Sequence, residues 1–350
     1  MRLPSRRFWK RLAAVYGVLL AVLVALELLA RAAEPGPFTF LDSNPYLEDE
    51  VLRHKHKADF VGHWEGTYFE TNSLGMRGPA VPLEKPPGEF RVVTLGDSCT
   101  FGKSVVESET WPRQLERLLG IEMPEGRAAR VANLGVNGFA AHEYHEMYFR
   151  LGARLAPDLV VIGYNLNDFP NVIFDVDHKV YKNRRLRVLF SQAVRDWLGR
   201  TASYRWLRAT YYEFKKESDW AAAERFARET ARNGQDSDVW RKQVRILSEI
   251  VAACHDAGTD VAVFLFPYES QVYLDAYDTT PIELARGLCH ELGVPFVDLA
   301  ERFREYAHRT DPPTGLFVRG DRYHPTGEGY AIVAEGVMEV VRERGWVPVE

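Results

Sequence analysis

The fold is most constrained by five short apolar runs that alternate with helical patterns from residue 91 onward. The runs occupy residues 91–95, 129–132, 159–163, 261–266 and 294–299. They are rich in β-branched residues, and runs of this kind are typical of strands buried on both faces in a parallel sheet covered by helices. The stretches between them carry helix signals, such as Thr110 as an N-cap and Gly120 as a stop. The alternation predicts an α/β fold, a three-layer α/β/α sandwich with a central, mainly five-stranded parallel sheet.

A serine and an Asp-His pair lie where such a sheet would place chemistry. The tripeptide Gly-Asp-Ser directly follows the first run, so Ser98 lies where a parallel strand turns toward a helix. Near the C-terminus, Asp321 precedes His324 by three residues, close enough for its carboxylate to reach the inner N–H of the imidazole. A serine hydroxyl becomes a nucleophile when an imidazole takes its proton, and that imidazole needs an acceptor that fixes its tautomer. The pattern therefore predicts Ser98 as nucleophile, His324 as base and Asp321 as orienting acid.

Two further strand ends carry groups that could stabilise an oxyanion. Residues 133–138 follow the second run, and Gly135 there lets a backbone N–H approach a ligand without an intervening side chain. Asn165 and Asn167 follow the third run, and either amide could reach the same pocket. Gly-Asp-Ser and Asp-x-x-His are each common as turns or caps. The prediction of catalysis therefore depends on all four segments occurring together, in one order.

These four segments resemble the four sequence blocks of the SGNH (GDSL-type) hydrolase superfamily, over residues 91–344 apart from one long insertion. The resemblance implies a flavodoxin-like fold and a serine hydrolase that needs no cofactor. It assigns the nucleophile, base and acid to Ser98, His324 and Asp321. It also implies an oxyanion hole formed by the N–H groups of Ser98 and Gly135 and the side-chain amide of Asn167.

The chain departs from the family pattern at two places. The third block usually reads Gly-x-Asn-Asp, whereas residues 163–168 hold additional residues. Asn165 therefore remains an alternative to Asn167, which directly precedes Asp168. Cys99 stands where an aromatic residue often follows the serine. Because adjacent residues at a strand-to-helix turn point in different directions, we expect Cys99 to be a packed thiol and not a nucleophile.

The composition fits an enzyme with a large core. A hydrophobic content of 46% in 350 residues can fill one large α/β domain, and a formal charge of −5 argues against nucleic-acid binding. The sequence has no Walker loop or GxGxxG turn, and no His, Cys and carboxylate pattern that predicts a metal site. We interpret His54, His56 and His63 as part of a surface loop. Cys254 and Cys289 could pair in an oxidising compartment, which the sequence leaves open.

The N-terminus has the pattern of a membrane anchor. Basic residues cluster at 2–11, and an apolar stretch that only Glu27 interrupts follows at 12–30. This length spans a bilayer core, and the basic flank predicts an N-terminus inside the cytoplasm. The catalytic domain of a single-pass protein would then be periplasmic or extracellular. The alternative is a cleavable signal peptide, because Ala30-Arg31-Ala32 resembles a cleavage site.

We therefore expect four parts: a cytoplasmic basic segment (1–11), a transmembrane anchor (12–30), a linker and irregular lead-in (31–89) and a hydrolase domain (90–350). An insertion at about 169–235 interrupts the last part and is longer than an ordinary connection. Within it, residues 179–216 combine basic and aromatic residues. This pattern indicates either a solvated helical face or a contact with anionic lipid or glycan beside the active site.

The sequence thus predicts an outward-facing, membrane-anchored serine hydrolase that cleaves an acyl or acetyl ester through an acyl-enzyme. Its partners would be the membrane and a small-molecule or glycan ester. A similar triad also serves a polysaccharide O-acyltransferase or O-acetyltransferase, which is the first alternative. The second is a catalytically silent protein of the envelope that binds glycan or assists its assembly.

Overall fold

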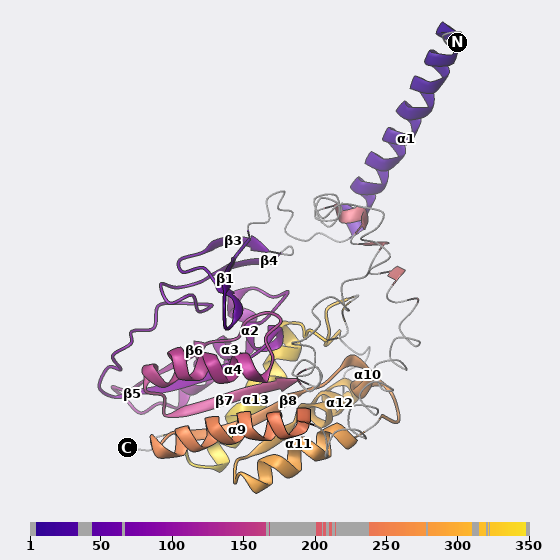
Figure 1. Cartoon of the computed structure of the whole chain (residues 1–350). Coiled ribbons are helices and arrows are strands. Elements are labelled where there is room, and N and C mark those ends of the chain that lie inside the picture. Colours follow the sequence, from indigo (N-terminus) through magenta and orange to yellow (C-terminus); the bar gives the residue numbers. More distant parts are fainter. Residues whose placement is uncertain are drawn as a thin grey trace.

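The computed structural model describes the N-terminal apolar helix, the lead-in and most of the α/β body (Figure 1). The described residues are 5–33, 44–64, 67–165, 168, 201–204, 206–207, 210–211, 214, 238–277, 279–309, 315–319, 321 and 323–347. Most of the predicted insertion, including residues 169–200, and the predicted site residue Asn167 lie outside them.

The body is built on a sheet of five parallel strands in the order β6-β5-β7-β8-β9. The strands are β5 (Glu89–Gly96), β6 (Ala128–Asn133), β7 (Leu159–Asn165), β8 (Asp260–Phe266) and β9 (Phe296–Asp298). The chain moves outward from β5 to β6 and then crosses back to β7 on the other side of β5. This reversal creates a switch point at the carboxyl ends of β5 and β7, where open α/β sheets bind ligands.

Helices cover both faces of the sheet, as the three-layer prediction requires, and this prediction is confirmed (Figure 1). The helices of the body are α2 (Ser98–Phe101), α3 (Trp111–Glu122), α4 (Ala141–Met147), α9 (Asp238–Asp256), α10 (Glu269–Tyr273), α11 (Thr280–Glu291), α12 (Leu299–Arg309) and α13 (Gly327–Glu343). Short 3-10 turns at Glu107–Glu109 and Ala153–Leu155 and a π turn at Tyr148–Gly152 complete it.

Successive strand residues feed two separate cores, because side chains alternate across a strand. Val92 packs with residues of α3, α12 and α13 on one face. Val93 packs with residues of α4, α9 and α11 on the other. Thr110 caps α3 as expected, but the helix continues past Gly120 to Glu122. The burial of both strand faces explains why the apolar runs lack polar alternation.

The lead-in is more regular than the sequence predicts. It forms two antiparallel hairpins, β1 (Tyr46–Asp49) with β2 (Arg53–His56), and β3 (Val61–Trp64) with β4 (Thr67–Glu70). In Figure 1 they lie beside α2, between the body and the N-terminal helix. Strands of four residues are too short for an alternation signal to stand out from the surrounding loops.

The histidine trio is not a surface loop, and that interpretation is wrong. His54 and His56 lie in β2 and His63 lies in β3. His56 is only 5% exposed. Burial, the nearby His54 and the charge of Arg77 lower the pKa of His56 to about 3, so it is neutral at physiological pH.

Helix α1 (Arg6–Ala33) projects from the body, and its apolar window has a mean hydropathy of 2.5 (Figure 1). It is the one helix among the described residues that is long and apolar enough to cross a membrane, a criterion that a signal sequence also meets. The acidic residue of this helix, Glu27, forms hydrogen bonds with two residues of the predicted insertion. The carboxylate accepts hydrogen bonds from the N–H groups of Ala202 (3.0 Å) and Ser203 (2.9 Å) and from the hydroxyl of Ser203 (2.8 Å).

Two glycines allow a direct test of the packing at the end of β5. A Cβ at Gly96 would overlap the side chain of Thr100 and lie 2.8 Å from the carbonyl oxygen of Gly163, whereas a Cβ at Gly120 in α3 would meet nothing within 4 Å. We expect Gly96→Ala to lower the free energy of unfolding by about 1–3 kcal/mol, because the backbone of β7 has to move. Gly120→Ala should leave it unchanged or raise it by up to about 1 kcal/mol. Thermal unfolding of the detergent-solubilised protein measures both, and equal stability of the two variants would contradict the close packing.

Candidate active site

Ser98 is held at a sharp turn between β5 and α2. Asp97 caps the helix by accepting the N–H of Cys99 at 2.8 Å, and Ser98 is the first helical residue. The helix is a single turn that ends at Gly102, whose N–H returns to the carbonyl of Ser98 at 3.0 Å and whose φ is +86°. A positive φ favours glycine there. The turn presents the side chain of Ser98 at the carboxyl end of the sheet, beside the switch point.

The three residues predicted as the triad are brought together across the fold. Nε2 of His324 lies 2.8 Å from Oγ of Ser98, and Nδ1 of His324 lies 2.6 Å from Oδ2 of Asp321. Since an ionised carboxylate only accepts hydrogen bonds, Nδ1 of His324 carries the proton. Nε2 is then the acceptor for the serine hydroxyl. This is the arrangement in which an imidazole can take the proton of Ser98.

Asp321 is fixed by its own loop as well as by the histidine. Its Oδ1 accepts the N–H groups of Tyr323 (2.9 Å) and His324 (3.2 Å). Its own N–H donates to the carbonyl of Val318 at 2.8 Å. Burial raises the pKa of Asp321, but the hydrogen bond and charge of His324, the N–H of Tyr323 and the charge of Lys103 outweigh it, so the pKa lies well below its ordinary value. Asp321 is therefore ionised throughout the physiological range.

A second buried acid organises the end of β7. Oδ1 of Asp168 accepts the hydroxyl of Tyr144 (2.9 Å) and Oδ2 accepts the N–H of Asn165 (2.8 Å). Its backbone carbonyl accepts the side-chain amide of Gln243 at 2.8 Å. Burial and the neighbouring Asp97 raise the pKa of Asp168 well above its ordinary value. Asp168 thus ties α4 and α9 to the end of β7, where Asn165 lies.

Cys99 is a packed thiol, as expected. It is completely buried, its Sγ lies 3.4 Å from the carbonyl oxygen of Tyr323, and it accepts the side-chain amide of Asn165 at 3.4 Å. Burial and the charges of Asp97 and Asp321 raise the pKa of the thiol. It therefore remains protonated and links the nucleophile turn to the loop of His324. Cys254 and Cys289 are also free and buried.

In the loop after β6, the N–H of Gly135 forms a hydrogen bond with the last residue of β6. This N–H donates to Oδ1 of Asn133 at 2.9 Å. A Cβ at Gly135 would overlap the N of Phe101 and lie 2.7 Å from the carbonyl carbon of Thr100, so glycine permits the loop to touch α2. Within the described residues, the N–H groups of Asn137, Gly138 and Ser98 donate to no acceptor. The role of Gly135 as an oxyanion donor stays a prediction, as does that of Asn167, which lies outside the described residues.

Arg77 supports the nucleophile turn and was not predicted as a site residue. Its guanidinium is buried and donates to the carbonyls of Phe101 (3.0 Å), Gly102 (2.6 Å) and Val105 (2.6 Å). It also forms a salt bridge with Glu107 at 3.2 Å. These bonds satisfy the carbonyls at the end of α2, where a helix has no internal donors. The sequence carried no signal for this role, because the groups that Arg77 bonds are backbone carbonyls.

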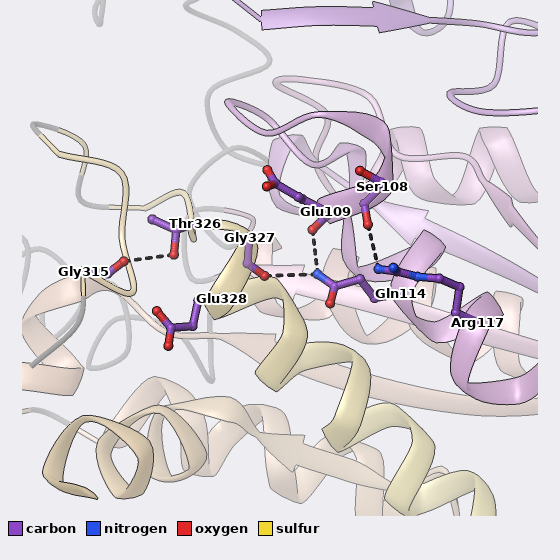
Figure 2. Close-up of a pocket in the computed structure, with 8 residues that line it drawn as sticks. All are labelled: Ser108, Glu109, Gln114, Arg117, Gly315, Thr326, Gly327 and Glu328. Atoms are coloured by element: carbon purple, nitrogen blue, oxygen red, sulfur yellow. Dashed lines mark hydrogen bonds between the residues drawn. The ribbon is translucent and has the colours of Figure 1, made fainter. Parts of the chain in front are cut away.

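A cavity of about 400 Å³ lies between the start of α3 and the start of α13, and no triad residue lines it (Figure 2). The side chain of Gln114 crosses it and donates to the carbonyls of Glu109 (2.8 Å) and Gly327 (3.0 Å). On its other wall Thr326 donates to the carbonyl of Gly315 at 2.9 Å. These contacts join the start of α3 to the start of α13 and so fix the residues that follow His324. Among the described residues, no group of three or more His, Cys, Asp or Glu side chains is arranged to hold a metal ion.

Comparison with known proteins identifies a family whose sequence pattern this chain matches. The model of the GDSL-like lipase/acylhydrolase family matches residues 94–332, more than half of the chain. No curated protein matches the chain. Among solved structures, the acetyl xylan esterase AlAXEase is similar at 14% identity, with 72% of this chain and 100% of that chain covered and a TM-score of 0.45. A catalytic mutant of Axe2, an acetylxylan esterase from Geobacillus stearothermophilus, is similar at 16% identity, with 75% and 97% covered and a TM-score of 0.44. TesA is similar at 14% identity, with 72% and 98% covered and a TM-score of 0.43.

The hydrogen-bonded chain of Ser98, His324 and Asp321 predicts how variants behave. Ser98→Ala and His324→Ala should each lower kcat by about 10⁴ or more, and Asp321→Asn should retain more activity. Because the residues act as one unit, the double variant Ser98→Ala, His324→Ala should be hardly worse than either single variant. Turnover of a short-chain nitrophenyl ester measures this, and clearly additive losses would refute the triad.

Proposed function

The chain belongs to the GDSL-like lipase/acylhydrolase family and is an enzyme that hydrolyses esters. From this we propose that it forms an acyl-enzyme on Ser98, and we propose separately that it acts outside the cytoplasm. The observation that carries the proposed acyl-enzyme is the continuous chain of hydrogen bonds from Ser98 through His324 to Asp321. Since the enzyme hydrolyses esters, the silent glycan-binding alternative is set aside.

The proposed reaction has two halves. Oγ of Ser98 attacks the ester carbonyl while Nε2 of His324 takes its proton, and His324 then protonates the departing alcohol. Nε2 of His324 then takes a proton from water, which attacks the acyl-enzyme, and returns that proton to Oγ of Ser98 as the acid is released. Asp321 remains ionised and stabilises the imidazolium in both halves. An added sugar acceptor that became acylated in the assay would identify the O-acyltransferase instead.

The oxyanion of each tetrahedral intermediate needs donors that are in place before it forms. The N–H of Ser98, which donates to no acceptor among the described residues, fits this role. A side-chain amide from the end of β7 would add a second donor. Asn165 already donates to Cys99, which supports Asn167 as the residue whose amide serves the substrate.

The two asparagines can be separated by substitution. Asn167→Ala should lower kcat by about 10²–10³ with little change in KM, because the lost hydrogen bond strengthens only as charge develops. Asn165→Ala removes the contact to Cys99 and should lose much less. If Asn165→Ala is the more damaged variant in steady-state kinetics, the additional residues of this segment have shifted the donor by two positions.

We also propose that α1 remains attached as a single span with its N-terminus inside. The basic residues of its first turns and the absence of buried surface in its apolar window support this. The insertion would then meet the membrane at the outer end of the span, where Glu27 contacts Ala202 and Ser203. Its described residues Leu207, Tyr211 and Phe214 are helical and exposed. Exposed apolar and aromatic side chains suit the interfacial region of a bilayer.

The topology makes a direct prediction. An alkaline phosphatase reporter fused after Glu34 should be active, because that enzyme folds only outside the cytoplasm. Mass spectrometry of the purified full-length protein should find the residues before Ala30 retained. A mature N-terminus at Ala33 would show that the segment is a signal peptide.

A further inference from the structure

We propose that His54 is a positioning residue of the active site: it orients the peptide between Asn137 and Gly138 so that the N–H of Gly138 donates to the oxyanion. The inference rests on the proposed function and adds to it the β1–β2 hairpin, which precedes every segment of the predicted site. In this inference the N–H of Gly138 takes the place that the sequence assigns to the N–H of Gly135, which donates to Oδ1 of Asn133.

The hairpin contacts the loop through three side chains. Nε2 of His54 lies 2.8 Å from the carbonyl oxygen of Asn137, and since a carbonyl only accepts, Nε2 carries the proton. Nη2 of Arg53 donates to the carbonyl of Gly138 at 2.7 Å. The hydroxyl of Tyr46 accepts the side-chain amide of Asn137 at 2.8 Å. Two consecutive carbonyls of the loop therefore face the hairpin.

The orientation of a carbonyl fixes the N–H of the same peptide. In a planar trans peptide the C=O of one residue and the N–H of the next point in opposite directions. Because the carbonyl of Asn137 faces His54, the N–H of Gly138 points away from the hairpin. Within the described residues it donates to no acceptor. An unoccupied N–H held in one direction is what a developing oxyanion requires.

The two halves of the loop are held by different parts of the protein. The first half is fixed by the sheet: the N–H of Leu134 donates to Thr94 (3.0 Å) and that of Val136 to Gly96 (3.2 Å), beside the nucleophile turn. The second half reaches Gly138, whose φ of +77° is favoured by glycine. In the described structure the donors to its carbonyls come from the hairpin, so loss of His54 releases the peptide that carries this N–H.

The ring of His54 is itself held in place. It packs edge-to-face on Tyr46, with ring centroids 5.0 Å apart, and against Phe139 at 5.5 Å. Arg53 is tied to Glu143, whose Oε2 accepts the N–H of Ala140 at 2.8 Å. The ring of His54 and the side chain of Arg53 are therefore each held by contacts besides those to the loop.

The test compares variants of the hairpin in the full-length protein. His54→Phe keeps an aromatic ring but removes the donor, and should lower kcat about tenfold or more with KM changed less than twofold. His54→Gln places an amide N–H near the position of Nε2 and should recover most of this loss. Lys55→Met is the matched control on the same strand, because the amine of Lys55 contacts Asp49 and not the loop. It should behave like the wild type.

A tetrahedral inhibitor provides a readout that a purely structural role would not move. An alkyl boronic acid forms an adduct with the serine that places an oxygen in the oxyanion position. Its affinity should fall in His54→Phe by about the same factor as kcat, while the thermal unfolding temperature stays close to that of Lys55→Met. If Ser98→Ala is inactive but His54→Phe loses only stability, or has unchanged kcat and boronic-acid affinity, the positioning role is refuted and the proposed function stands. Unchanged activity of Ser98→Ala would instead overturn the proposed function.

Discussion

Two glycines that face each other across neighbouring strands let the nucleophile helix rest directly on the end of the sheet. Gly96 and Gly163 are partners in the β5–β7 register, and a Cβ on either would overlap Thr100 of α2. The distance between α2 and the sheet sets the position of Ser98. It also sets the close contact of α2 with Gly135 and the hydrogen bonds from Arg77 to the carbonyls at the end of α2. The position of Ser98 in the site therefore depends on the absence of a side chain at both glycines.

The two buried acids near Ser98, Asp321 and Asp168, have pKa values shifted in opposite directions by their burial and their hydrogen-bond partners. Asp321 is largely enclosed but faces His324 and several N–H groups, which keep it ionised. Asp168 is more deeply buried, beside Asp97, and its pKa is raised. The first acid can stabilise positive charge on an imidazole, whereas the second serves as a hydrogen-bonded anchor for the strand end. The same contrast explains why the thiol of Cys99, one residue from the nucleophile, remains protonated.

Features of this protein that depend on neighbouring residues in the sequence could be predicted, whereas features that depend on contacts between distant residues could not. The strands β5, β7 and β8 consist mostly of apolar residues, so their residues alone indicate a buried parallel sheet. The spacing of Asp321 and His324 is likewise a local property of the sequence. The hairpins of the lead-in were missed because their four-residue strands alternate weakly. The burial of His56 also depends in part on aromatic rings far away in the sequence, such as Phe101. The engagement of Gly135 by Asn133 was equally invisible, because sequence shows that a glycine permits close approach but not which acceptor its N–H meets. Arg77 carried no catalytic pattern at all, since its targets are backbone carbonyls.

The match to the family begins at residue 94, after the hairpins and after Arg77. A fragment cut at that boundary would keep the triad but would lose the guanidinium that bonds the carbonyls of Phe101, Gly102 and Val105. Those oxygens are buried, and a buried carbonyl without a donor destabilises its surroundings. The segment that matches the family, residues 94–332, is therefore shorter than the segment that has to fold as one unit, which includes Arg77. Any attempt to separate the α/β body from α1 has to cut upstream of β1 and not at residue 94, where the family match begins.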